Sequence, residues 1–135
     1  MPSSGMLTRN AALDPGRPVV LVVEDDELLR ALLVEVISEA GAFVEAVNTV
    51  DAGLRTFEHY QDIGLIVTDV VTPGVLTGWD LAKAVYERRP ELPVIITSGY
   101  SVHFGTELPP NASFLPKPWS LVQLVNMVKE RFSSR

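Results

Sequence analysis

Three apolar runs in this chain do not alternate with polar residues, and each ends at an acid or a hydroxyl. They are PVVLVVEDD (18–26), GLIVTD (64–69) and PVIITS (93–98). A strand with one solvent-exposed face alternates apolar and polar residues. Unbroken runs of Val, Leu and Ile therefore indicate strands that are buried on both faces. Such strands occur in parallel sheets, whose crossover connections place helices on both faces. The chain is therefore predicted to be an α/β protein.

The segments between these runs supply the crossovers. Leu, Val and Ile recur at three- and four-residue steps from 27 to 40, which predicts a helix that ends at Gly41. A weaker strand (42–48) precedes a helix that Asn48 or Thr49 could cap. The later expected elements are a helix over 79–88, a short strand over 113–117 and a helix over 121–132. Residues 99–112 contain two prolines and two glycines, and predict an irregular or shortened fourth helix.

Composition limits the classes of protein to be considered. A length of 135 residues favours one domain, with residues 1–17 as a flexible N-terminal arm and 18–135 as the domain. The absence of cysteine rules out disulfides and thiolate metal sites. A net charge of −6 without a basic run disfavours nucleic acid as a partner. The sequence shows neither an apolar stretch of ~20 residues nor a signal-peptide core, so we expect a cytoplasmic protein without membrane contact.

Polar residues gather where the predicted strands end, and ligands of such sheets bind beyond the carboxyl ends of the strands. These residues are Glu24, Asp25, Asp26, Asp69, Thr97, Ser98 and Lys117. Taken alone, each of them could be merely a helix cap, a turn residue or a solvated charge. Together they are more specific, because clustered carboxylates repel one another unless a cation is present. Mg²⁺ prefers oxygen ligands, and an ammonium and a hydroxyl would suit a phosphoryl group.

The order and spacing of four short motifs resemble the receiver domain of two-component response regulators. The motifs are VVED (22–25), TD (68–69) with Pro73 after it, TSG (97–99) and FLPKPW (114–119). The resemblance extends over about 17–135. It implies a flavodoxin-like, doubly wound sheet of five parallel strands in the order 2-1-3-4-5.

The resemblance also implies roles for individual residues. Asp69 would accept the phosphoryl group, and Lys117 would pair with it, next to a cis Lys117–Pro118 bond. Mg²⁺ would be held by Asp25, by Glu24 through water, by Asp69 and by the backbone carbonyl of Val71. The bulk of Val71 and Tyr100 would make self-dephosphorylation slow. The chain would then be no enzyme beyond this Mg²⁺-dependent self-phosphorylation and slow loss of phosphate.

Two neighbouring residues are candidates for the switch hydroxyl. Neighbouring residues of a strand face opposite ways, so only one of Thr97 and Ser98 can face the phosphate. The spacing from Pro93 favours Ser98, with Thr97 as the alternative. Phe114 matches the aromatic switch position, although it has no tyrosine hydroxyl.

The chain departs from the common family pattern in three further places. Thr72 replaces a Met. Gly78 lies nine residues after Asp69, one more than in the commonest form, which resembles receivers of hybrid histidine kinases and some stand-alone receivers. The stretch between Ser98 and Lys117 is about three residues short, which puts the usual output surface in doubt.

The preferred interpretation is a receiver that takes phosphate from a sensor histidine kinase or phosphotransfer protein and signals through protein contacts. Only Ser-Ser-Arg follows Phe132, so no output domain is expected, and a homodimer is left open. Alternatives are a fragment of a hybrid histidine kinase and a phosphorylation-independent interaction module. A haloacid dehalogenase-type phosphatase needs a second Asp where Val71 stands. A flavodoxin needs a phosphate loop where the acids stand.

Overall fold

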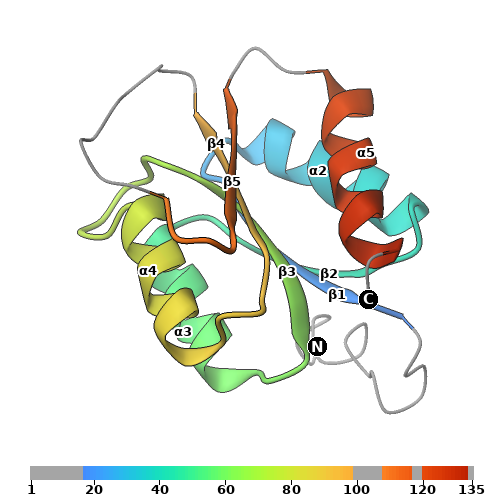
Figure 1. Cartoon of the computed structure of the whole chain (residues 1–135). Coiled ribbons are helices and arrows are strands. Elements are labelled where there is room, and N and C mark those ends of the chain that lie inside the picture. Colours follow the sequence, from blue (N-terminus) through green and yellow to red (C-terminus); the bar gives the residue numbers. More distant parts are fainter. Residues whose placement is uncertain (1–16, 99–107, 117–119, 134–135) are drawn as a thin grey trace.

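The computed structural model describes residues 17–98, 108–116 and 120–133. Its centre is one sheet of five parallel strands in the order β2-β1-β3-β4-β5 (Figure 1). The strands are β1 (Val19–Val23), β2 (Phe43–Val47), β3 (Ile63–Asp69), β4 (Val94–Ser98) and β5 (Ala112–Pro116). This confirms the predicted strand order and the flavodoxin-like fold.

Helices cover both faces of the sheet. They are α2 (Glu27–Glu39), α3 (Val50–His59), α4 (Gly78–Arg88) and α5 (Leu121–Ser133). Figure 1 shows α2 and α5 together on one face, and α3 and α4 together on the other. The unbroken apolar runs are explained by this arrangement, because each inner strand has a helical layer on both sides.

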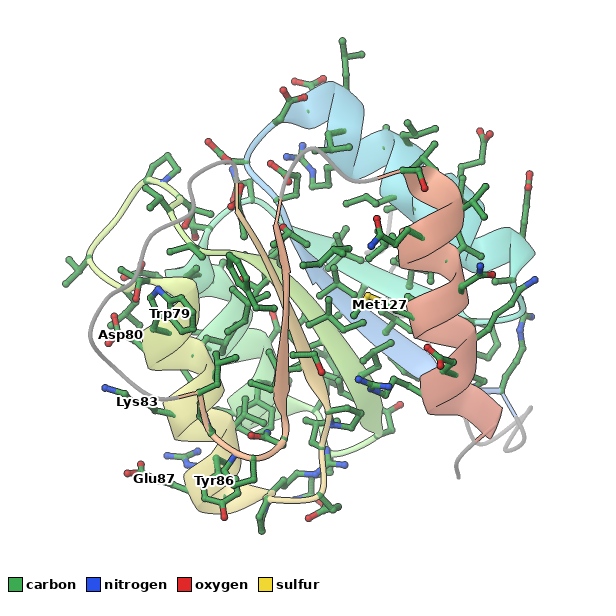
Figure 2. The ribbon with its side chains drawn as sticks, turned by 45° about the horizontal axis from the view of Figure 1, so that its top comes forward. Trp79, Asp80, Lys83, Tyr86, Glu87 and Met127 are labelled. Atoms are coloured by element: carbon green, nitrogen blue, oxygen red, sulfur yellow. The ribbon has the colours of Figure 1, made fainter. Side chains whose placement is uncertain are left out.

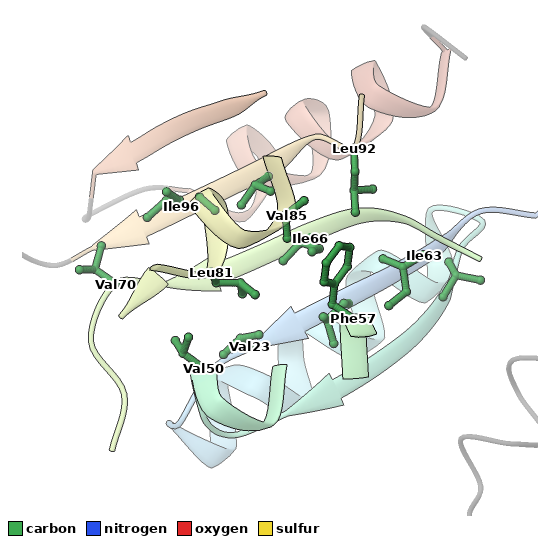
Figure 3. Packing of buried hydrophobic residues seen from close by; sticks show 14 residues of the cluster. Val23, Val50, Phe57, Ile63, Ile66, Val70, Leu81, Val85, Leu92 and Ile96 are labelled. Atoms are coloured by element: carbon green, nitrogen blue, oxygen red, sulfur yellow. The ribbon is translucent and has the colours of Figure 1, made fainter. Parts of the chain in front are cut away.

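Side chains of one strand divide between two cores. Val19, Leu21 and Val23 pack toward α3 and α4, whereas Val20 and Val22 pack toward α2 and α5. In Figure 3 Phe57 of α3 and Leu81 and Val85 of α4 lie over the sheet in the first of these cores. All five residues of β1 are buried. A strand buried on both faces does not need alternation, as the sequence predicted.

Local capping sets where the helices begin. Asp26 caps α2, and its Oδ1 accepts from the Leu29 N–H at 2.9 Å. Thr49 caps α3 by accepting from the Ala52 N–H at 3.0 Å, which resolves the choice between Asn48 and Thr49. Thr77 and Asp80 form a reciprocal capping box at α4. These caps satisfy backbone N–H groups that a helix start leaves without an intrahelical partner.

The pairing of β1 with β3 contains one irregularity. Val19 pairs with Ile63 but Val20 pairs with Leu65, so β3 holds one extra residue, Gly64, at this point. The register then continues regularly until Val23 pairs with Thr68. An extra residue of this kind shifts every later pair of the two strands by one position.

Several expectations fall wholly or partly outside the described residues. Of the N-terminal arm, only Arg17 is described; its Nε donates to the Gly41 carbonyl at 3.3 Å. Of the expected irregular fourth helix, residues 99–107 are not described. Within the described parts, no helix combines the length and the apolar character that crossing a bilayer requires.

Candidate functional site

Two hydrogen-bonded strands bring the predicted acids together. β1 and β3 are neighbours, and their last described pair is Val23 with Thr68. Glu24 follows Val23 and Asp69 follows Thr68, so the two acids lie side by side at the carboxyl end of the sheet. Carboxylate oxygens of Glu24, Asp25 and Asp69 all lie within 4.8 Å of one another. The sequence predicted this grouping, and it follows from the register.

Glu24 is buried and hydrogen-bonded, which is unusual for an acidic residue. It is only 3% exposed. Its N–H donates to the Val47 carbonyl at 3.1 Å, and its Oε2 accepts from the Asp26 N–H at 3.0 Å. The Arg30 guanidinium donates to the Glu24 carbonyl oxygen at 3.0 Å. The side chain is therefore fixed at the base of the group, whereas Asp25 is exposed and open to solvent.

The donor set fits a hard divalent cation. Three carboxylates this close together repel one another, and a cation between them would offset the repulsion. All three offer oxygen, which Mg²⁺ prefers, and one of them is exposed, which leaves a side from which water and substrate oxygens can approach.

Asp69 is tied to its own strand end and, through the next residue, to β4. Its Oδ1 accepts from the Val70 N–H at 2.8 Å, and the same N–H donates to the Thr97 carbonyl at 3.0 Å. Asp69 is half-buried, with Val70 fully buried beneath it. The carboxylate therefore keeps one face toward the other acids while its backbone is anchored in the sheet.

The loop after Asp69 closes on itself through Gly78. The Gly78 N–H donates to the Val70 carbonyl at 2.8 Å, so the start of the loop meets its end. A Cβ at position 78 would lie 2.5 Å from the Asp69 carbonyl oxygen and 3.1 Å from Val70 Cα. Only glycine permits this close approach of two backbones.

The same loop is tied to the first turn of α3. The Thr72 Oγ1 accepts from the Val50 N–H at 2.8 Å, and the Asp51 Oδ1 accepts from the Leu76 N–H at 3.2 Å. In the sequence, Thr72 stood out only as a departure from the family pattern, and Asp51 did not stand out at all. An acid in the first turn of a helix has an ordinary local reading, so the sequence carried no signal for this contact.

The switch candidates lie on β4 and β5. Thr97 is buried, and its Oγ1 donates to the Thr68 carbonyl at 3.5 Å. Ser98 ends β4 and pairs with Pro116 of β5; its side chain lies outside the described part. The Phe114 ring stacks on Trp79, with centroids 6.0 Å apart and planes 20° apart. Figure 2 shows Trp79 at the first turn of α4, and sequence reasoning had not assigned it to the site.

Lys117, the Lys117–Pro118 bond and Tyr100 lie outside the described residues. β5 ends at Pro116, the residue before Lys117. Val71, whose carbonyl was expected to bind metal, follows Val70 at the start of the loop, and its side chain is 59% exposed.

Known proteins share this sequence pattern and fold. Sensor kinase CckA of Brucella abortus (strain 2308) is 36% identical over 119 residues, which are 85% of this chain but 12% of that protein. Response regulator receiver protein CpdR of the same strain is 30% identical over 116 residues, covering 82% of this chain and 93% of CpdR. A crystal structure of a response regulator receiver protein from Sinorhizobium medicae WSM419 has a TM-score of 0.81 at 23% identity, covering 87% of this chain and 96% of the other.

A family model described as the response regulator receiver domain matches residues 20–129. That range contains both acidic strand ends, the loop from Val70 to Thr77 and the β4–β5 edge. Together with the similarity to CpdR, it shows that the chain belongs to the response regulator receiver domain family of two-component systems.

Proposed function

We propose that Asp69 accepts a phosphoryl group from a histidine kinase or a phosphotransfer protein, and that the domain signals by changing its contacts with other proteins. One observation carries most of the weight: a half-buried Asp69 carboxylate lies within 4.8 Å of two further carboxylates at the carboxyl edge of a parallel sheet. The family match supports the same assignment.

The residues that would hold Mg²⁺ are Asp25 and Asp69 directly, Glu24 through water, and the Val71 carbonyl. The ion would neutralise negative charge on the transferring phosphoryl group. Glu24 suits the outer role, because its side chain is buried and already accepts from the Asp26 N–H. Asp25 suits the inner role, because it is exposed at the mouth of the group.

In the transfer step, a carboxylate oxygen of Asp69 forms a bond to phosphorus while the bond from phosphorus to the donor nitrogen or oxygen breaks. The electron pair of the broken bond stays with the donor, on a ring nitrogen of the phosphorylated histidine or on the carboxylate of the acetate that acetyl phosphate releases. The bond from the Val70 N–H to Oδ1 orients the carboxylate for this attack. Lys117 is the proposed side-chain cation for the transferring group.

Ser98 is the proposed switch hydroxyl, supported by the position of its neighbour. The Thr97 hydroxyl already donates to the Thr68 carbonyl within the sheet, which leaves Ser98 as the candidate for the phosphoryl group. After transfer, Ser98 would turn toward the phosphoryl group, and Phe114 would follow. The stack of Phe114 on Trp79 makes α4 part of that change.

The partners are proposed to be a kinase or phosphotransfer protein upstream and a protein downstream, in the cytoplasm. The relatives represent two settings in which this chain could act, as a receiver protein such as CpdR or as part of a sensor kinase such as CckA. A second copy of the chain is a further candidate partner.

Incubation with acetyl phosphate and Mg²⁺, followed by intact mass, tests the acceptor. Wild type should gain one phosphoryl group, and both Asp69→Asn and treatment with EDTA should abolish the gain. Asp26→Asn is the matched control: it removes a neighbouring acid, while Asn remains a good cap for α2. An unmodified wild type, or a gain that survives in Asp69→Asn, would refute the assignment.

A further inference from the structure

The loop from Val70 to Thr77 is held at two separate levels. At its base, the Gly78 N–H meets the Val70 carbonyl, and the Val70 N–H meets the Thr97 carbonyl. Farther out, Thr72 and Leu76 are bonded to the first two residues of α3, Val50 and Asp51. The second level belongs to a different element from the acids, and the proposed mechanism does not use it.

The contact of Thr72 is buried and therefore firm. Thr72 is 7% exposed, and Val50 is fully buried. The Val50 N–H is one of the helix-start donors that have no partner within the helix, and the Thr72 hydroxyl oxygen accepts from it at 2.8 Å. Without that oxygen, a buried donor would be left unpaired, so the bond strongly favours this loop position.

Asp51 holds the other half of the loop. Its carboxylate lies in the first turn of α3, where negative charge is favoured. Besides accepting from the Leu76 N–H, the carboxylate fills the space beside Gly74. A Cβ there would lie 2.6 Å from Oδ1, and the φ of Gly74 is +117°. The turn at Gly74 and the Asp51 side chain therefore fit each other closely.

Val71 lies between these two levels. Its side chain is 59% exposed, so little side-chain packing can hold it. Its backbone is fixed by its neighbours: Val70 is bonded to β4 and to Gly78, and Thr72 is bonded to α3. We infer that Thr72 and Asp51 are positioning residues, which act through the loop to place the Val71 carbonyl beside the acids. This inference rests on the proposed function, in which that carbonyl binds Mg²⁺.

Mg²⁺ affinity tests the inference independently of phosphorylation. The affinity is measured by NMR: Mg²⁺ is titrated into the protein, and the backbone amide resonances of Glu24, Asp25 and Asp69 are followed. Thr72→Val keeps the shape and removes the acceptor, and we expect affinity to fall about tenfold, as is typical when an outer partner of a metal ligand is lost. Thr72→Ser should restore affinity. Thr56→Val is the matched control, because its hydroxyl donates to the Ala52 carbonyl within α3, away from the loop.

Asp51→Ala provides a second route, which carries the test if Thr72→Val does not fold. It should also weaken Mg²⁺ binding, while Asp51→Asn, which keeps an acceptor oxygen, should retain most of it. Wild-type affinity in folded Asp51→Ala or folded Thr72→Val would overturn the role of that residue and leave the phosphoacceptor proposal intact. A wild type that neither binds Mg²⁺ nor gains a phosphoryl group would overturn both.

Discussion

Gly78→Ala is the sharpest test of how the backbone holds Asp69. A methyl group at this position would lie 2.5 Å from the Asp69 carbonyl oxygen and 3.2 Å from its carbonyl carbon. These atoms belong to a sheet strand and cannot rotate away. Either α4 moves outward, which lengthens the 2.8 Å bond from Gly78 to Val70, or the end of β3 moves with Asp69 on it.

The expected loss of stability follows from two opposed terms. Inserting a methyl group into a packed site costs roughly 1–3 kcal/mol. Alanine in place of glycine returns up to about 1 kcal/mol of helix propensity. A net loss of about 1–2 kcal/mol at a urea slope of about 2 kcal/mol per molar lowers the unfolding midpoint by roughly 0.5–1 M.

Two measurements on each protein separate stability from site geometry: urea unfolding by circular dichroism, and the rate of phosphorylation by acetyl phosphate. Gly53→Ala is the control, because its Cβ would lie 2.7 Å from the Val23 side chain, inside the core and away from the Asp69 backbone. Both variants should lose stability, but only Gly78→Ala should also be phosphorylated more slowly. An unchanged midpoint in Gly78→Ala, or equal rates in the two variants, would refute the reasoning.

Two further outcomes are expected. Val71→Asn should speed hydrolysis of the acyl phosphate, because an amide two residues past Asp69 could orient water toward it, which the apolar Val71 side chain cannot do. Val75→Asn, the same change at an 87% exposed position on the same loop, is the control. An unchanged or slower decay in Val71→Asn would contradict the idea. Leu124→Ala should lower the free energy of unfolding by about 2–5 kcal/mol, since Leu124 is fully buried between α5 and the sheet, and a loss under about 1 kcal/mol in urea unfolding would show that the core can collapse around the gap.

The sequence predicted most of the sheet, because strands that are buried on both faces appear in the sequence as unbroken apolar runs. The helices expected over 27–40, 79–88 and 121–132 also lie where they were predicted, but which of their residues are buried was predicted less well. Leu28 and Leu33 both belong to the apolar pattern of the first helix, yet Leu33 is buried and Leu28 is 84% exposed. Apolar residues at both three- and four-residue steps surround more of the helix than one sheet face can cover, so periodicity alone could not tell which of them would be buried.

Contacts between segments that are distant in the sequence were the main features of the structure that the sequence did not predict. Asp51 and Leu76 are 25 residues apart, and each is locally ordinary, an acid in a first helical turn and an apolar loop residue. Trp79 and Phe114 stack only because α4 crosses beside β5 (Figure 2). Such pairings depend on how loops and helices pack against the sheet and against one another, which local sequence patterns do not encode. The acids were easier to predict, because the carboxyl ends of parallel strands always share an edge.

The extra residue at Gly64 has an effect at the opposite end of the sheet. Had β1 and β3 continued the alignment of Val19 with Ile63, Val23 would lie opposite Val67, and Glu24 would adjoin Thr68 instead of Asp69. A shift of one residue also turns every side chain of a strand to the other face. The meeting of the acids is thus decided several residues before either strand reaches them: it depends on Gly64 having no partner in β1, because a ladder that paired Gly64 with Val20 would separate Glu24 from Asp69 without altering either acid.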